Sequence, residues 1–344
     1  MHEMERRAAI EAVVEASSLG AAVQSNLLST GAVNKEDRSP VTVADFGVQA
    51  LISDMLATSF PDVPLVSEED SELLRNPDNE NLKDLVVAYV RRYRPTLTKE
   101  SEIFKAIDRG KAQGGGLGRF WALDPIDGTK GFLRGGQYVV ALALIEEGQV
   151  TLGVMGCPNL PLHSLQKKDY LGCVFAAVKG EGSYCRGFDE PEEIKISVSS
   201  LSDPADALFC ESFEPSHSSH DQVAHILELL GAKRPPLRMD SQGKYGLLAR
   251  GEGTVYLRLP TRESYEEKIW DHAAGTIIVE EAGGRVTDLR GKPLDFSRGR
   301  TLNNNKGIVA TNGLLHERVL QAVKAVSTGN ALRHSAQSAG KSRG

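Results

Sequence analysis

The stretch Phe120–Gly136, FWALDPIDGTKGFLRGG, decides how the chain around it is organised. Its first four residues are apolar, which is typical of a buried strand. Asp124 and Asp127 follow, and Pro125 between them fixes its own φ and removes a backbone donor, which stiffens the chain. Gly128 permits backbone geometry that a larger residue resists. The stretch therefore predicts a strand that ends in a rigid turn presenting two carboxylates together.

The chemistry that suits such a turn is the binding of a hard divalent cation. Mg²⁺ is usually held by few carboxylates, together with waters and phosphate oxygens. Thr129 adds a hydroxyl at the exit of the turn. The alternative is an ordinary Asp-Pro…Asp-Gly turn at a strand end, which is common without any metal.

The chain after this turn has two successive patterns. Two strand-rich runs with short turns, at Glu147-Gly148 and at residues 180–182, indicate an antiparallel meander. From about Ile194 strands and helices alternate, which indicates an α/β layer. We expect an α+β domain over residues 1–193, with an antiparallel sheet, and a smaller α/β domain over residues 194–326. Residues 327–344 are small, polar and basic, and are predicted to be a disordered tail.

Three further carboxylates lie at expected element ends. Asp45 follows Thr42–Ala44, expected as extended chain, at the predicted start of an apolar helix, and Asp271 stands at the start of another. Glu68 follows the predicted strand Val63–Val66. Helix capping explains Asp45 and Asp271 equally well, and an acidic cluster such as that around Glu68 is usually solvated surface.

Candidate anion-binding residues lie in the second half of the chain. Ser241 and Lys244 enter a predicted helix, where the N-terminus suits a phosphate or the serine simply caps the helix. Arg258 is a guanidinium in an apolar strand and needs an acidic or phosphate partner. His217 and His220 lack a third ligand at zinc-site spacing, so an exposed loop is the simpler interpretation.

Composition excludes several functional classes. The 344 residues carry a formal net charge of −6, which argues against nucleic acid as a partner. No run of eighteen apolar residues is present, so no membrane partner is expected. Four cysteines without a Cys-x-x-Cys pair fit a reducing compartment, with a regulatory disulfide as the alternative. The N-terminus lacks the features of a targeting peptide, so we expect a cytoplasmic protein, or an organellar one if a transit peptide was trimmed.

Taken together and in this order, separated blocks of the sequence resemble the inositol monophosphatase superfamily of Mg²⁺-dependent, lithium-sensitive phosphatases. The blocks are VTVADFGVQA (41–50), LVSEEDS (65–71), WALDPIDGTKGFLRG (121–135) and KIWDHAAG (268–275) with EAGG (281–284). The blocks SFEPSHSSHD (212–221), DSQGKYGLLARG (240–251) and VYLRLP (255–260) resemble its 3′(2′),5′-bisphosphate nucleotidase branch in plants and fungi. The resemblance covers the chain from the first helix to about Val326.

The resemblance implies a layered αβαβα sandwich with the site between its halves, and a role for each matching residue. The implied metal ligands are Asp45, Glu68, Asp124, Asp127, Asp271 and the carbonyl of Ile126. Thr129 and Asp45, with Glu68 beside them, would position and deprotonate the attacking water. The nucleotide and its non-reacting phosphate would contact His217, Ser241, Lys244 and Arg258, and Asp271 and Thr129 would also bind the substrate.

The implied activity is removal of the 3′-phosphate from adenosine 3′,5′-bisphosphate and its sulfate-carrying derivative by a monomer using two or three Mg²⁺ ions. Inositol polyphosphate 1-phosphatase activity and a non-catalytic nucleotide sensor remain as alternatives. Two departures from the family pattern stand out: Ser67 before the acidic pair, and the Asn-rich loop Arg300–Lys306, RTLNNNK. Both are predicted to lie away from the assigned ligands, the second in a surface loop.

Overall fold

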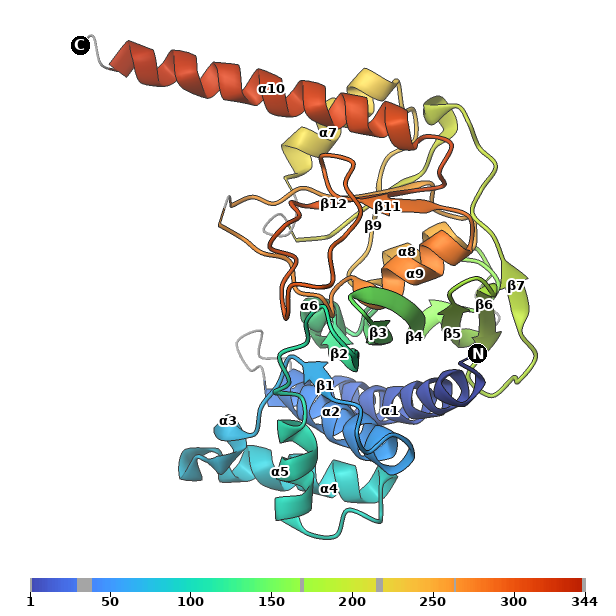
Figure 1. Ribbon diagram of the computed structural model, residues 1–344, viewed down its shortest axis with the longest axis vertical. Coiled ribbons are helices and arrows are strands. Elements are labelled where there is room, and N and C mark those ends of the chain that lie inside the picture. The colour runs from blue at the N-terminus through green and yellow to red at the C-terminus, as the bar shows by residue number, and fades with distance from the viewer. Residues whose placement is uncertain (1, 30–38, 168–169, 215–218, 263, 342–344) are drawn as a thin grey trace.

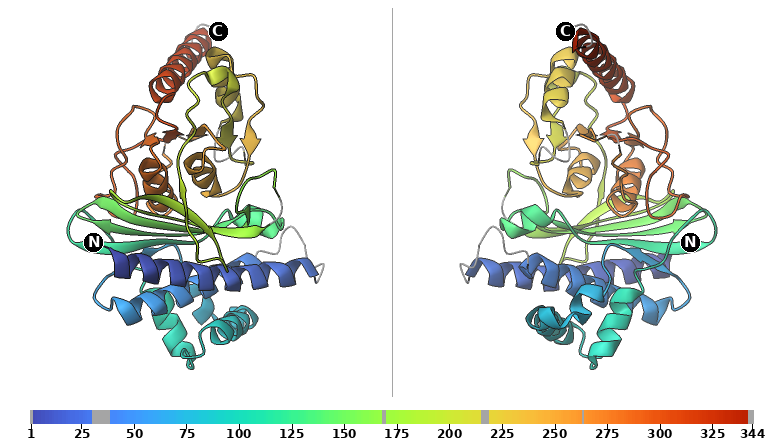
Figure 2. Two further views of the ribbon diagram at one scale, coloured as in Figure 1. Left: turned by 90° about the vertical axis from the view of Figure 1, so that its right-hand side faces the viewer. Right: turned by 90° about the vertical axis from the view of Figure 1, so that its left-hand side faces the viewer.

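The computed structural model describes residues 2–29, 39–167, 170–214, 219–262 and 264–341. Five layers are visible in Figures 1 and 2: a helical layer, a large sheet, a pair of helices, a small sheet and an outer pair of helices. This is the predicted αβαβα sandwich. The helices are α1 (Glu3–Ser29), α2 (Ser39–Ser59), α3 (Glu72–Arg75), α4 (Glu80–Tyr93), α5 (Glu100–Asp108), α6 (Thr129–Leu133), α7 (His220–Leu230), α8 (Gly243–Ala249), α9 (Ala273–Glu281) and α10 (His316–Lys341), with 3₁₀ turns at Pro77–Asn79 and Pro204–Asp206.

The large sheet follows chain order from β1 to β7. β1 pairs with β2 in parallel, and every later pair is antiparallel, so the predicted meander is confirmed. Its strands are β1 (Leu65–Ser67), β2 (Arg119–Asp127), β3 (Val139–Glu146), β4 (Gln149–Pro161), β5 (Leu171–Val178), β6 (Gly182–Gly187) and β7 (Ile194–Ile196).

The small sheet has the order β11-β12-β10-β8-β9. β8, β9 and β10 are parallel, and β12 runs antiparallel between β10 and β11. The strands are β8 (Phe209–Glu211), β9 (Leu237–Arg238), β10 (Val255–Arg258), β11 (Arg285–Thr287) and β12 (Ile308–Thr311). The alternation expected after residue 194 is therefore present, and α8 and α9 fill the space between the two sheets (Figure 1).

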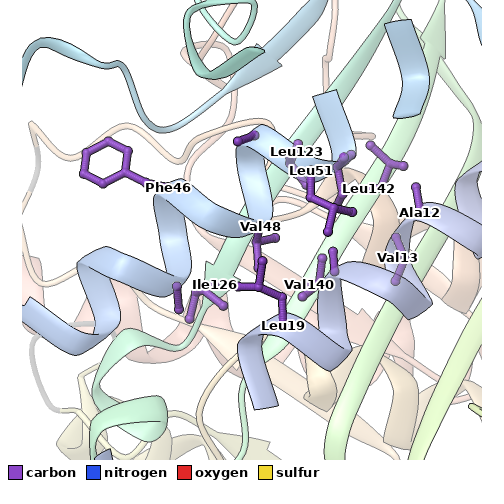
Figure 3. Packing of buried hydrophobic residues seen from close by; sticks show 14 of the residues in the cluster. Ala12, Val13, Leu19, Phe46, Val48, Leu51, Leu123, Ile126, Val140 and Leu142 are labelled. Carbon is purple, nitrogen blue, oxygen red and sulfur yellow. The ribbon is translucent and has the colours of Figure 1, made fainter. Parts of the chain in front are cut away.

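The large sheet is buried on both faces, which explains its continuous apolar runs. Trp121 and Leu123 in β2 face the α1–α2 layer, whereas Phe120 and Ala122 face α8 and α9. Successive side chains of a strand point to opposite faces of the sheet, so neighbouring residues of β2 enter different cores. A sheet that is covered on both faces therefore has strands of continuous apolar sequence. Figure 3 shows the first of these cores, where side chains of α1 and α2 pack on β2 and β3; they include Val13, Leu19, Val48, Leu51, Leu123 and Leu142.

Two local predictions are wrong. The chain of Asp124–Asp127 is the last part of β2, which continues with a register shift against β3 instead of turning. Residues 42–44 are helical, because α2 begins at Ser39, so Asp45 lies inside a helix and does not start one. Pro40 lies in the first turn of α2, where a proline is well tolerated. The helix can therefore begin before the β-branched residues Thr42 and Val43. Helix α10 continues to Lys341, over part of the segment expected as a disordered tail, and extends beyond the other layers (Figure 1).

Helix α2 contains one segment that could cross a membrane by length and composition alone. That segment is Val41–Ser59, with a mean hydropathy of 1.2, and 72% of it is buried inside the protein. Burial against α1, α4, α5 and β2 accounts for its apolar character as a core helix.

Close packing of α8 against α9 leads to a first prediction, for Gly275→Ala. A Cβ at Gly275 would lie 2.2 Å from Cδ2 of Tyr245, whose ring is fixed by a 2.9 Å hydrogen bond between its hydroxyl and Nδ1 of His272. Overpacking costs about 1–3 kcal/mol, which exceeds the gain of about 1 kcal/mol from replacing a helical glycine. We expect a lower free energy of unfolding, measured by denaturant titration.

Gly243→Ala is the matched control for this packing prediction. It also lies in α8, but the nearest atoms to its added Cβ are Sδ of Met239 and Oγ of Ser241, both at 3.3 Å. We expect Gly243→Ala to lower the free energy of unfolding clearly less than Gly275→Ala does. Equal or increased stability of Gly275→Ala would contradict the packing argument.

Candidate active site

A cavity of about 210 Å³ lies between the two halves of the molecule. It is bounded by the ends of β1 and β2, the start of α6, the start of α8 and the end of β10. Nine of the residues predicted from the sequence line it: Glu68, Asp124, Ile126, Asp127, Thr129, Ser241, Lys244, Arg258 and Asp271. Asp45 lies behind this lining, buried and close enough to interact electrostatically with Asp124 and Glu68. His217 lies outside the described residues.

Burial, followed by the charge of neighbouring carboxylates, raises the pKa values of four acidic side chains in this region. Burial raises the pKa of Asp127 to about 6, and the charge of Asp271 adds to the effect. Partial loss of water around Glu68, followed by the charge of Asp271, raises its pKa to about 8 even though part of its side chain reaches solvent. Burial, followed by neighbouring carboxylates, also raises the pKa values of Asp124 and Asp45 well above the ordinary range. Such a concentration of negative charge requires compensation.

The donor set fits a divalent cation. Asp124 Oδ1 is buried and has no hydrogen-bond partner among the described residues, which is costly for a carboxylate oxygen. In the part of the chain that the structure describes, the Asp127 carboxylate accepts a hydrogen bond only from the backbone N–H of Gln242. Among the described residues, no ammonium or guanidinium group is bonded to Asp124 or Asp127, and hard carboxylate oxygens of this kind are suitable ligands for ions such as Mg²⁺.

A second acidic group nearby is less suited to a metal. The ligand atoms of Glu267, Asp271 and His272 lie within 4.8 Å of one another. Glu267 is bonded to Arg258 at 2.8 Å and to His272 Nε2 at 3.1 Å. Burial would raise the pKa of Glu267, but Arg258 and His272 together outweigh burial and lower it to about 2. His272 also bonds Tyr245 through its other nitrogen. Only Asp271 in this group therefore remains suited to a cation.

The site depends on close contact between the two halves. Gly128 has φ +89°, and a Cβ there would lie 2.9 Å from Cβ of Ser241, so glycine is required at this contact. Thr129 begins α6 immediately after this glycine and lines the cavity. Ser241 has φ +73°, and this unusual backbone directs the next N–H, that of Gln242, toward Asp127. Strain of this kind is typical of functional sites.

Lys244 is more enclosed than the sequence predicted. It is only 2% exposed, and its Nζ donates to the carbonyls of Met239 at 2.9 Å and Ser241 at 2.7 Å. An ammonium group has three N–H donors, so one N–H of Lys244 is left after these two hydrogen bonds. Burial lowers its pKa to about 8, although Asp127 partly offsets this effect. Lys244 thus stiffens the turn around Ser241 as well as lining the cavity.

Comparison with known proteins identifies the family. Residues 3–328 match the inositol monophosphatase family. The chain belongs to this family. The chain is 48% identical over 336 residues to a protein of Oryza sativa named 3′(2′),5′-bisphosphate nucleotidase, covering 93% of each chain. A Schizosaccharomyces pombe protein of the same name is 43% identical over 340 residues, covering 95% of this chain and 96% of the relative.

Solved structures of the inositol monophosphatase family share the fold. The Thermotoga maritima IMPase superposes with a TM-score of 0.60 at 20% identity, covering 96% of this chain and 99% of that one. CysQ from Bacteroides thetaiotaomicron gives a TM-score of 0.57 at 22% identity, covering 90% and 98%. Members of the family are metal-dependent, in agreement with the carboxylate cluster.

Arg258 has the acidic partner that its apolar strand required. Its Nε lies 2.8 Å from Oε2 and 3.0 Å from Oε1 of Glu267, and its Nη2 lies 3.6 Å from Asp271 Oδ2. Nη2 also donates to the hydroxyl of Tyr265 at 3.1 Å. The guanidinium is therefore fixed at the cavity wall in a planar geometry that suits bidentate recognition of phosphate.

Several cavity residues were missed by the sequence analysis. They are Lys130, Ser212, Glu214, Asp240, Gln242, Tyr256 and Tyr265. Gln242 sits inside a quoted block, and its side chain bonds the carbonyl of Trp270 at 2.9 Å and the N–H of Gly275 at 3.3 Å. The position of Gln242 between the assigned residues Ser241 and Lys244 was the one sequence signal that could have suggested a place in the site. For Tyr265, no local pattern distinguishes it from a surface tyrosine.

Proposed function

We propose that this protein is a Mg²⁺-dependent phosphatase that removes the 3′-phosphate from adenosine 3′,5′-bisphosphate, and from its sulfate-carrying derivative, to leave the 5′-substituted nucleotide. The observation that carries the proposal is the meeting of five carboxylates, from α2, the segment after β1, β2 and the segment before α9, in and behind one cavity that Lys244 and Arg258 also line. The names of the relatives from Oryza sativa and Schizosaccharomyces pombe support the choice of substrate.

Each part of the cavity has a proposed role. The carboxylates of Asp45, Glu68, Asp124, Asp127 and Asp271, with the carbonyl of Ile126, would hold two or three Mg²⁺ ions. Bound Mg²⁺ neutralises phosphate oxygens and lowers the pKa of a coordinated water. Thr129, Asp45 and Glu68 orient the attacking water and accept its proton. The water oxygen bonds to phosphorus as the P–O bond to the 3′ oxygen breaks, and the 3′ oxygen takes up a proton to become the ribose hydroxyl, so no covalent enzyme intermediate is required.

The non-reacting 5′-phosphate has its own contacts in this proposal. Ser241, Lys244 and Arg258 line the cavity opposite β2 and supply hydroxyl, ammonium and guanidinium donors. Charge-assisted hydrogen bonds of this kind are stronger than neutral ones. His217, also assigned to the nucleotide by resemblance, lies outside the described residues and stays a prediction.

Release of inorganic phosphate tests the proposed function. The purified chain is incubated with adenosine 3′,5′-bisphosphate with and without Mg²⁺, and with inositol 1,4-bisphosphate in parallel. We expect rapid Mg²⁺-dependent release of one phosphate and formation of AMP. Binding of the nucleotide without hydrolysis, or a preference for the inositol phosphate, would contradict the proposal.

Arg258→Met tests recognition of the second phosphate. A hydrogen bond to a charged group contributes about 1.5–3 kcal/mol, so we expect KM for adenosine 3′,5′-bisphosphate to rise about 10- to 100-fold. KM for adenosine 3′-monophosphate, which lacks the 5′-phosphate, should change much less. The measurement is steady-state kinetics on both substrates. An equal rise in both KM values would show that Arg258 does not recognise the second phosphate.

A further inference from the structure

Arg300 connects the β11–β12 loop to the first half of the molecule. Its Nη1 donates to the carbonyls of Gly110 at 3.1 Å and Ala112 at 2.9 Å, and its Nη2 donates to the carbonyl of Ser67. The N–H of Ser67 in turn bonds the carbonyl of Gly110 at 2.9 Å. The half-buried guanidinium of Arg300 is therefore hydrogen-bonded both to the end of β1 and to the segment after α5. Its fixed, planar set of donors suits three carbonyls better than an ammonium would.

The same residue is also fixed to the segment before α9. The carbonyl of Arg300 accepts the N–H of Ile269 at 3.2 Å, and the N–H of Leu302 donates to the carbonyl of Glu267 at 2.8 Å. The guanidinium also stacks over the ring of Trp270, with 4.8 Å between its central carbon and the ring centroid. The loop thus pairs with this segment as a short antiparallel connection.

These two anchored segments each lead directly into a cavity carboxylate. Ser67 immediately precedes Glu68, and Trp270 immediately precedes Asp271. The two carboxylates belong to different halves of the molecule and repel each other when both are ionised. Their approach must therefore be imposed by the surrounding structure, and Arg300 contacts the residue before each of them.

We propose that Arg300 is a positioning residue that holds Glu68 and Asp271 at the separation needed to bind a divalent cation. It acts through the backbone of both segments and through its stacking on Trp270. The inference rests on the proposed metal-dependent phosphatase function. It also corrects the expectation that the Arg300–Lys306 loop concerns only the surface.

The test is the affinity for Mg²⁺ in the absence of substrate, measured by isothermal titration calorimetry on the full chain. Loss of a residue that orients metal ligands typically costs about 10- to 100-fold in metal affinity, and we expect a loss in this range for Arg300→Met. Arg300→Lys, which keeps the charge but not the planar donors, should have an intermediate effect. In phosphate-release assays the variants should need more Mg²⁺ for half-maximal activity, and raising Mg²⁺ should restore most of kcat.

Arg250→Met is the matched control. Arg250 also reaches from the second half to carbonyls of the first, bonding Pro161 at 2.6 Å and Leu162 at 3.0 Å, but it does not line the cavity. It should lower the melting temperature and leave Mg²⁺ affinity unchanged.

Unchanged Mg²⁺ affinity in a folded Arg300→Met protein would overturn the inference, as would an equal loss in Arg250→Met. If Arg300→Met does not fold, wild-type affinity in Arg300→Lys would overturn it. A wild-type protein that binds Mg²⁺ and hydrolyses the bisphosphate leaves the proposed function standing in each of these cases. A wild-type protein that binds no Mg²⁺ overturns both.

Discussion

Asp127→Asn is expected to reduce turnover of adenosine 3′,5′-bisphosphate by about 10³-fold or more at saturating Mg²⁺, since a metal-bound transition state is stabilised by several kcal/mol and each 1.36 kcal/mol is tenfold in rate. The fold should survive. The side-chain oxygen of Asn can still accept the hydrogen bond from the N–H of Gln242, and removal of one negative charge relieves repulsion with Asp271. The melting temperature without metal should therefore equal or exceed that of the wild type.

Asp240→Asn is the control for this prediction. Asp240 lines the same cavity, but its carboxylate is paired with Arg134 and lies outside the carboxylate cluster. We expect less than a tenfold change in turnover, roughly the effect of weakening one charged contact. Wild-type turnover in Asp127→Asn, or an equal loss in Asp240→Asn, would remove the basis for the metal assignment.

The second large effect expected is a stabilisation by Mg²⁺ that grows with pH. The pKa of Asp127 is raised from 3.8 to about 6, and that of Glu68 from 4.5 to about 8. Because the folded state holds these protons more tightly than the unfolded state, their contribution to stability is fully present below about pH 4 and is lost as pH rises from about 4 to 8. Mg²⁺ competes with these protons and compensates the exposed negative charge, so it stabilises most at pH 8.

The measurement is the difference in melting temperature with and without Mg²⁺, at equal ionic strength, between pH 5.5 and pH 8. The difference isolates the site from His316, whose pKa is lowered to about 4 by burial and whose contribution changes with pH in the opposite direction. A ligand at 100 times its Kd adds about 2.7 kcal/mol of stability, which should raise the melting temperature by several degrees at pH 8. A constant or shrinking difference with rising pH would contradict the proposed cluster.

The layers of this fold could be predicted because their pattern is local. The hairpin turn at Glu147-Gly148, the strand-rich runs around it and the later alternation of strands and helices each produce a pattern in residues close together in the sequence. The structure contains all three. The assembly of the carboxylates was expected only through resemblance to a family. Asp45 and Asp271 are 226 positions apart in the numbering, and both lie close enough to Asp124 to raise its pKa. No spacing along the chain indicates this.

What the sequence could not predict depends on packing between distant segments. Asp45 seemed to start a helix because Thr42 and Val43 are β-branched, but burial of α2 against α1 and β2 overrides that preference. Lys244 seemed an open phosphate ligand, yet the carbonyls of Met239 and Ser241 engage it. The bonds from Arg300 to Ser67 and Gly110 join residues about two hundred positions apart, and no local signal predicts them.

The strand orders of the two sheets have a consequence for how the chain folds during synthesis. In the large sheet each strand pairs with its neighbour in sequence, so hairpins can form one after another while the ribosome is still translating the rest. In the small sheet β12, the last strand of the chain, is inserted between β10 and β11, so this sheet closes only after β12 has emerged. A nascent chain stalled before Ile308 would hold a finished meander and an unfinished second half, exposing the faces of α8 and α9 to chaperones.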